Sequence, residues 1–326
     1  MPDAVSPAEE SESLLLEKCI ALYQAKQYQD LISAAESQLQ RASDGVGSTE
    51  PAPVMGAVWG LVGLSKQALG DDEAAHAAFE AAIRASPEAG RHTYRGYLAA
   101  LASRVAHQLL DRAQTFGQDE GDERVETFKQ AVLWLRRGVG AAPDDENLRV
   151  SLDRAQQELW AAIEQLTAHA IRALQDGQEQ DVLISLGRTT ALLSSISEDA
   201  LVPKRREEAY RRLWWAYTKL GVGRLEAGEF EAALEPLLHA LKLDLGDPER
   251  QQETREALVR TLEAIADRRT GLIDQLLKDG QRESALAEGE RLLALIREGM
   301  EAGLSDEEIS SALTKTHHVI EQVQQS

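Results

Sequence analysis

One stretch decides the fold: residues 59–87 read WGLVGLSKQALGDDEAAHAAFEAAIRASP. Its two apolar helical patterns are separated by residues 70–72, a Gly-Asp-Asp sequence typical of a turn followed by a helix start. Gly63 lies inside the first pattern, where glycine costs up to about 1 kcal/mol relative to alanine. A close approach of the two helices accounts for that cost, with Ala75 as the matching small residue on the second helix and Phe79 filling the space between hairpins. The stretch therefore predicts a hairpin of two packed helices that ends before Pro87.

Similar turns recur in the second half of the chain. Gly177, Gly228 and Gly280 each lie between two helical patterns, at spacings of 51 residues (177 to 228) and 52 residues (228 to 280). This period exceeds the roughly 34 residues of a standard two-helix repeat. The extra residues precede the first helix of each hairpin, and they either lengthen that helix or form a third one. We favour lengthened first helices.

Composition and charge narrow the class of protein. The chain is 43% hydrophobic but only 5% aromatic, which favours helix over strand. Its net charge of −20 disfavours binding to nucleic acid or anionic membranes, since both attract positive charge. No apolar run approaches the roughly 20 residues of a membrane helix, and the acidic start lacks the apolar core of a signal peptide. We expect a cytoplasmic protein in which the single cysteine, Cys19, is a buried structural thiol.

The chain resembles the tetratricopeptide repeat (TPR) family, in which Trp-x2-Leu-Gly opens a first helix and later Ala, Phe and Pro mark the second. Residues 56–89 match this pattern strongly, and residues 214–247 match it well. In the latter range the signature positions hold Tyr217, Leu220, Gly221, Ala233, Leu237 and Ala240. The resemblance implies an all-α, right-handed TPR-like α-solenoid of about five or six helical hairpins. Later repeats are expected to have extended first helices, and a C-terminal capping helix to follow.

Four segments are expected along the chain. They are a disordered acidic N-terminus (1–12), N-terminal TPR-like repeats (13–140), extended TPR-like repeats with a period of about 51 (141–304) and the capping helix (305–326). The capping helix is predicted from Ser305 and Glu308, which have the spacing of a capping box.

The resemblance also implies a partner-binding groove lined by the first helix of each hairpin. Carried over by register, the groove residues are Trp215, Thr218, Val222, Leu225, Leu64 and Gln67. The Lys, Asn and Arg residues with which one TPR subclass grips C-terminal carboxylates of chaperones are missing at these positions, which disfavours that function. The groove is largely apolar, so we expect a partner protein or peptide that binds through an apolar segment.

A basic segment stands out in this acidic chain, and it comprises Lys204, Arg205, Arg206, Arg211 and Arg212. Glu207 and Glu208 are spaced to form i,i+4 ion pairs with the last two. The first three follow Pro203 at a helix start, where cations oppose the helix dipole by roughly 0.3–1 kcal/mol each. The segment is either a solvated structural face or a partner-binding patch.

The adjacent Trp214 and Trp215 cannot point the same way, because neighbours on a helix lie about 100° apart. By register Trp215 faces the groove, with burial of both rings as the alternative.

Motifs of catalysis are missing from the sequence. We find no phosphate-binding loop, dinucleotide fingerprint, His-Glu-x-x-His or nucleophile elbow. Catalytic residues, cofactors and metal ligands are therefore not expected. The first hypothesis is a non-catalytic scaffold or adaptor that binds a partner protein. The alternatives are a self-assembling structural protein, in which homo-oligomers form, and an accessory or regulatory subunit of an enzyme or chaperone complex.

Overall fold

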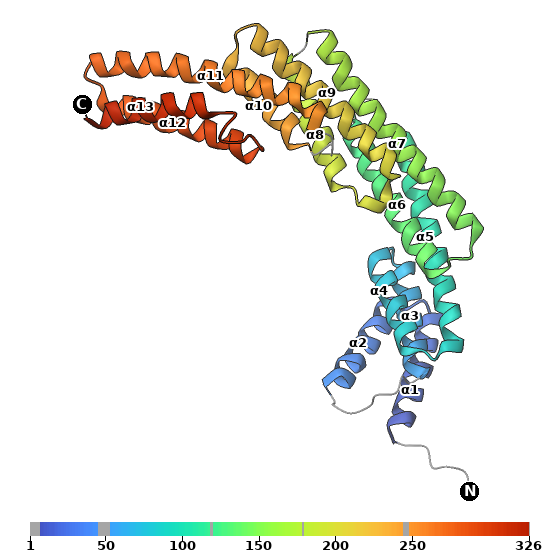
Figure 1. Cartoon of the computed structure of the whole chain (residues 1–326). Helices are drawn as coiled ribbons and strands as arrows, with labels where there is room; N and C mark the ends of the chain where they lie inside the picture. The colour runs from blue at the N-terminus through green and yellow to red at the C-terminus, as the bar shows by residue number, and fades with distance from the viewer. Residues whose placement is uncertain (1–6, 45–52, 118–119, 178, 244–247, 326) are drawn as a thin grey trace. The chain divides into compact units, whose positions relative to one another are not determined.

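The structure is a computed structural model that describes residues 7–44, 53–117, 120–177, 179–243 and 248–325. Every regular element within these ranges is helical (Figure 1). The helices are α1 (Pro7–Gln24), α2 (Tyr28–Asp44), α3 (Pro53–Ala68), α4 (Asp72–Ala85), α5 (Glu88–Thr115), α6 (Gly121–Ala141), α7 (Glu146–Gln175), α8 (Glu179–Ser195), the 3-10 helix η2 (Glu198–Ala200), α9 (Pro203–Glu226), α10 (Phe230–Lys242), α11 (Pro248–Lys278), α12 (Arg282–Glu301) and α13 (Ser310–Gln325). The predicted all-α class is confirmed.

The chain forms two compact units, residues 1–159 and residues 160–326, which divide within α7. Packing inside each unit follows chain order. In the first, α1 to α6 contact their sequence neighbours, and α1 also contacts α3. In the second, α8 to α13 do the same, with further contacts of α11 with α9 and with α13. Within the described residues these contacts define five helical hairpins, α1–α2, α3–α4, α5–α6, α9–α10 and α11–α12, followed by α13, which agrees with the predicted five or six.

Four of the hairpin turns share one hydrogen-bonding pattern. At Gly70, where φ is 82°, the glycine N–H donates to the Gln67 carbonyl and the next N–H donates to the Lys66 carbonyl. This is a Schellman-type helix end, which requires a left-handed residue and so favours glycine. Gly228 and Gly280 close their helices in the same way. In the first hairpin Lys26 takes the glycine position with φ of 59°.

The close helix contact predicted from Gly63 is present, but the nearest side chain on the second helix is that of Phe79 and not the predicted Ala75. A Cβ atom added at Gly63 would lie 2.6 Å from Cε1 of Phe79, whose ring is fully buried. In the hairpin α9–α10 a Cβ added at Gly221 would lie 2.5 Å from Cγ of Leu237. Each glycine thus makes room for a large side chain of the second helix, because a methyl group would occupy the same space.

The extra residues of the later repeats lengthen the first helices, as we favoured. The first helix α3 has 16 residues, whereas α5, α7, α9 and α11 have 28, 30, 24 and 31. Between α8 and α9 lies the short helix η2, which has only 3 residues. Each lengthened helix therefore carries added turns at its N-terminal end.

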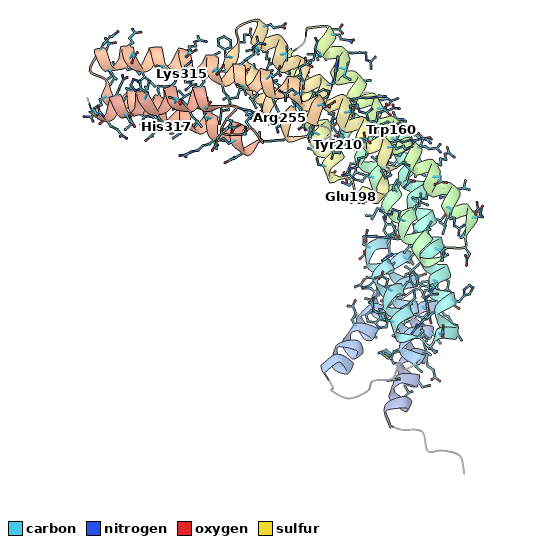
Figure 2. The ribbon with its side chains drawn as sticks, in the orientation of Figure 1. Trp160, Glu198, Tyr210, Arg255, Lys315 and His317 are labelled. Atoms are coloured by element: carbon cyan, nitrogen blue, oxygen red, sulfur yellow. The ribbon has the colours of Figure 1, made fainter. Side chains whose placement is uncertain are left out.

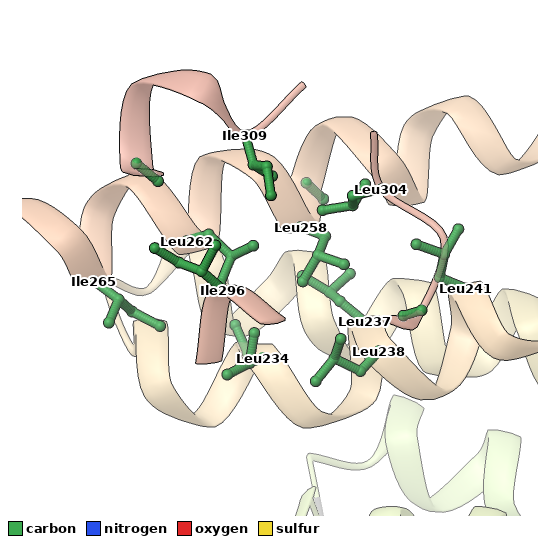
Figure 3. Packing of buried hydrophobic residues seen from close by; sticks show 14 of the residues in the cluster. Leu234, Leu237, Leu238, Leu241, Leu258, Leu262, Ile265, Ile296, Leu304 and Ile309 are labelled. Carbon is green, nitrogen blue, oxygen red and sulfur yellow. The ribbon is translucent and has the colours of Figure 1, made fainter. Parts of the chain in front are cut away.

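Leucine and isoleucine side chains fill the space between the last hairpins of the second unit. Figure 3 shows side chains of α10, α11 and α12 meeting in this cluster. Its members include Leu234, Leu237, Leu238, Leu241, Leu258, Leu262, Ile265 and Ile296, together with Leu304 and Ile309 from the segment before α13. The cluster joins consecutive hairpins, as expected for a repeat array that has no single central core.

Two element boundaries differ from the sequence predictions. Helix α13 begins at Ser310 rather than near Ser305, because residues 306–309 form a turn. The capping-box contacts nevertheless form: the Ser305 N–H and hydroxyl both donate to Glu308, at 2.7 and 2.8 Å. Helix α1 begins at Pro7, within the range expected to be disordered, and residues 1–6 of that range lie outside the described residues. The four-segment division itself stays a prediction.

Candidate partner-binding site

The N-terminal extension of α9 carries the basic segment, and two of its four arginines are held by aromatic or backbone partners. Arg205 places its guanidinium 5.9 Å from the centroid of the Trp160 ring. Arg206 donates to the Ile196 carbonyl at 3.1 Å and lies 5.9 Å from the Tyr210 ring. Trp160 and Tyr210 are labelled in Figure 2. Such cation–π contacts contribute about 0.5–1 kcal/mol at exposed sites, which offsets the unfavourable helix dipole.

Acidic partners hold the other two arginines. Arg211 donates to Glu207 at 2.7 Å, as the i,i+4 spacing predicted. Arg212 pairs with Glu208, which was also predicted, and additionally with Glu164 of α7 at 3.2 Å. Arg212 therefore links α9 to α7 through carboxylates on both sides. Lys204, the remaining member of the basic segment, is exposed.

The two tryptophans point to different environments. Trp214 donates its indole N–H to the hydroxyl oxygen of Thr254 on α11 at 3.0 Å, and that hydroxyl lies 2.8 Å from the hydroxyl of Thr218. Thr218 and Thr254 are both buried, so this polar contact has little competition from water. The Trp215 side chain, by contrast, is 42% exposed.

These residues surround an open pocket of about 490 Å³. It is lined by Ile171, Arg211, Arg212, Trp214 and Trp215. Ile171 lies on α7, and the other four lie on α9. The pocket combines apolar surfaces with two guanidinium groups, a combination suited to a peptide that has both an apolar and an anionic group.

The predicted groove residues differ in how deeply they are buried. Thr218 and Leu225 are only 5% and 7% exposed, and Val222 packs against the cluster formed with α10, α11 and α12. Helix α11 packs against α9 and α10, so the side chains of Thr218 and Leu225 make internal contacts. These two side chains are therefore too buried to line a partner-binding groove. In the other unit, Leu64 and Gln67 are half-buried on α3, and their role stays a prediction.

Sequence reasoning missed Ile171 and Glu164, which complete the pocket and its ion pairs. The sequence indicates that α7 is a first helix and hence a neighbour of α9. Helical periodicity does not show which residues of α7 face α9. A second, smaller pocket of about 230 Å³ was also missed. It is lined by Glu231, Leu234, Glu235, Leu238, His239, Lys242 and Glu298.

The described residues were also compared with the requirements of a metal site, a membrane helix and a reactive thiol. Within the described ranges no group of three or more His, Cys, Asp and Glu side chains is placed to hold a metal ion. None of the helices searched there combines the length and apolarity needed to cross a bilayer. Cys19 is buried, as predicted, and burial raises the pKa of its thiol, which disfavours the reactive thiolate.

Comparison with known proteins yields distant structural similarities only. No family model matches the chain, and no curated protein matches its sequence. Among solved structures, a circular tandem repeat protein with a novel repeat topology is 17% identical, with 98% of this chain and 74% of that chain covered and a TM-score of 0.30. The P58(IPK) TPR domain is 11% identical, with 98% and 68% covered and a TM-score of 0.29. The assembly chaperone of RpL4 (Acl4) is 18% identical, with 96% and 98% covered and a TM-score of 0.23. At these values the similarity assigns no function to the chain.

Proposed function

We propose that this protein is a non-catalytic helical-repeat adaptor that binds a segment of a partner protein at the α7–α9 pocket, in the cytoplasm. The observation that carries the proposal is the exposed Trp215 ring at a pocket bordered by arginines. Tryptophan and arginine, with tyrosine, are the side chains that most often dominate protein–protein binding energy, because they bury a large area in well-packed pockets.

The surroundings of Trp215 support this function because they hold the pocket in one arrangement. Trp214 is anchored by its hydrogen bond to Thr254, and Arg212 is anchored by carboxylates of both α7 and α9. A pocket whose walls are already ordered avoids part of the entropy cost of binding. An adaptor of this kind needs no cofactor or metal.

The test is a native-lysate pull-down with the full chain, the Trp215→Ala variant and the Leu272→Ala variant. Leu272 is a matched control because it is another large apolar side chain on a first helix, 45% exposed on α11. We expect a partner captured by the wild type to be lost from Trp215→Ala and kept by Leu272→Ala. Both variants are expected to unfold within about 0.5 kcal/mol of the wild type, since each change is at an exposed site.

Two results would count against the adaptor. Unchanged capture by a folded Trp215→Ala variant would show that the pocket does not bind the partner. Recovery of only the chain itself, with a size that rises with concentration, would favour the self-assembling alternative. The variant Val222→Glu would not report on binding alone. Val222 packs against the α10–α12 cluster, and a charge there would destabilise the fold.

A further inference from the structure

We infer that the α7–α9 pocket receives an acidic segment of another protein, which inserts an aliphatic or aromatic side chain beside Trp215 and sets a carboxylate against Arg211. This inference rests on the proposed function and specifies the chemistry of the partner. It concerns the N-terminal extension of α9, where Arg211 and Arg212 precede the TPR-like part of the helix.

Positive charge is concentrated in the N-terminal half of α9. Residues 204–219 contain six bases and two acids, a net charge of +4, in a chain whose net charge is −20. The bases are Lys204, Arg205, Arg206, Arg211, Arg212 and Lys219. A basic surface on an otherwise acidic protein attracts an acidic segment and orients it during encounter, and this attraction weakens as salt is added.

The ion pairs indicate which arginine can bind a carboxylate of the partner. Arg212 contacts two glutamates, Glu164 and Glu208, so its charge is neutralised within the chain. Among the ion pairs of the described residues, Arg211 takes part in one, with Glu207, and the side chains of this pair are 43% and 58% exposed. An exposed pair of this kind is worth only about 0–1 kcal/mol, so a partner carboxylate can replace Glu207 at little cost.

Pocket size and lining supply the apolar half of the recognition. The volume of about 490 Å³ lies in the range of pockets that enclose whole ligand groups. Ile171, Trp214 and Trp215 are its apolar walls. Because Trp214 is fixed by Thr254, an inserted leucine or phenylalanine side chain meets an ordered wall on one side and the exposed Trp215 ring on the other.

The charge of the whole chain indicates where the acidic segment comes from. Two copies that each carry −20 repel one another over the distances at which encounter begins. A short acidic segment of another protein carries much less charge, so this penalty is smaller for it. We therefore assign the pocket to a different protein, and a second copy of the chain becomes an outcome that the test can detect.

The test uses fluorescence anisotropy with the full chain and a short labelled peptide of Glu, Ala and Leu, patterned as an amphipathic helix. One matched peptide replaces Glu by Gln, and another replaces Leu by Ser. We expect the Glu/Leu peptide to bind and both replacements to weaken binding by about tenfold or more. Added salt should weaken only the binding of peptides that contain Glu.

Protein variants locate the effect. Arg211→Gln should weaken binding of the Glu/Leu peptide by about tenfold, while Arg84→Gln should leave it unchanged. Arg84 is a matched control because it is also an exposed arginine with a glutamate four residues earlier, Glu80 at 3.9 Å. Circular dichroism and thermal unfolding check that both variants are folded.

Each outcome supports or overturns the inference. Equal binding of the Gln peptide, or no effect of Arg211→Gln, would overturn it. If Trp215→Ala loses its native partner while Arg211→Gln keeps it, the adaptor stands and the acidic partner is wrong. If both variants keep the partner, both proposals fail. Association of the chain with itself that disappears in Arg211→Gln, measured by sedimentation velocity, would replace the outside partner with a second copy.

Discussion

The hairpins α3–α4 and α9–α10 share their internal packing and differ in how the first helix begins. In both, a glycine of the first helix lies against a large buried side chain of the second, Phe79 in one and Leu237 in the other. Helix α3 has 16 residues, whereas α9 has 24. The packed core of the hairpin therefore tolerates a longer first helix, because the addition lies beyond the glycine contact.

The added part of α9 carries the arginines of the candidate site, next to Trp214 and Trp215. Arg205, Arg206, Arg211 and Arg212 all lie on the N-terminal side of Trp214, where the TPR-like range begins. In α9 the hairpin contact and the site thus occupy different turns of one helix. This separation predicts that changes at the glycine contact act on stability, whereas changes at the pocket act on binding.

The largest expected effect comes from filling the glycine contact of the longer hairpin. In Gly221→Ala the new Cβ would lie 2.5 Å from Cγ of Leu237 and 3.4 Å from the Ala233 carbonyl oxygen. Overpacking of this kind costs about 1–3 kcal/mol, which exceeds the gain in helix propensity of up to about 1 kcal/mol. The free energy of unfolding, measured with urea, should fall accordingly.

Gly223→Ala is the matched control in the same helix, because nothing lies within 4 Å of a Cβ added there. It should raise the free energy of unfolding by up to about 1 kcal/mol. Gly63→Ala extends the comparison to α3–α4 and should be destabilising, since its Cβ would meet Phe79 at 2.6 Å. Equal stability of Gly221→Ala and Gly223→Ala would show that the contact does not constrain the hairpin.

A slightly smaller effect is expected from the polar contact that the longer hairpin makes with α11. Thr254→Val removes the acceptor of the Trp214 indole N–H and a partner of the Thr218 hydroxyl. Because Thr254 is fully buried, its loss should cost about 1–2 kcal/mol. Thermal unfolding measures the loss, and Thr254→Ser, which keeps the hydroxyl, should recover most of it. A Thr254→Val variant as stable as the wild type would show that these hydrogen bonds do not stabilise the fold.

The smallest effect concerns the extension of α11, which is held to the turn before α13 by charge. Burial alone would raise the pKa of Glu308, but hydrogen bonds from Ser305 and Arg255 outweigh it and lower that pKa. A carboxyl whose pKa is lowered in the folded state stabilises the fold above its unfolded pKa of about 4.3. This contribution is lost as the pH falls through the folded pKa.

Glu308→Gln should therefore cost about 1 kcal/mol at neutral pH. The difference from wild type should shrink as the pH drops below about 4, and urea unfolding at several pH values measures it. Glu307→Gln, in an exposed side chain of the same turn, is the control. A stability difference for Glu308→Gln that is independent of pH would contradict the assignment.

Much of the fold could be predicted from local patterns. Gly63, Phe79 and the turn at Gly70 were enough for the first clear hairpin, because the contacts involved are short in sequence. The i,i+4 pairs of Arg211 and Arg212 were predictable for the same reason. The spacing of the turn glycines predicted extra residues before each later hairpin, but it left open whether they lengthen the first helix or form a third one.

The site was predictable only in part. Periodicity placed Trp215, Thr218 and Leu225 on the first helix, but it does not reveal which later helix covers which face. Helix α11 contacts α9 and α10, so Thr218 and Leu225 are buried while Trp215 remains exposed.

Helical hairpins, their turns and the charge of each segment were determined by residues within about one repeat of each other, since helix periodicity, glycine conformation and i,i+4 pairing are local. The pocket depended on long-range packing. Ile171 and Glu164 reach Trp215 and Arg212 from a neighbouring first helix, and Thr254 orients Trp214 from another. Rotation of one helix against the next is set by side-chain packing in three dimensions, which no single helical pattern contains.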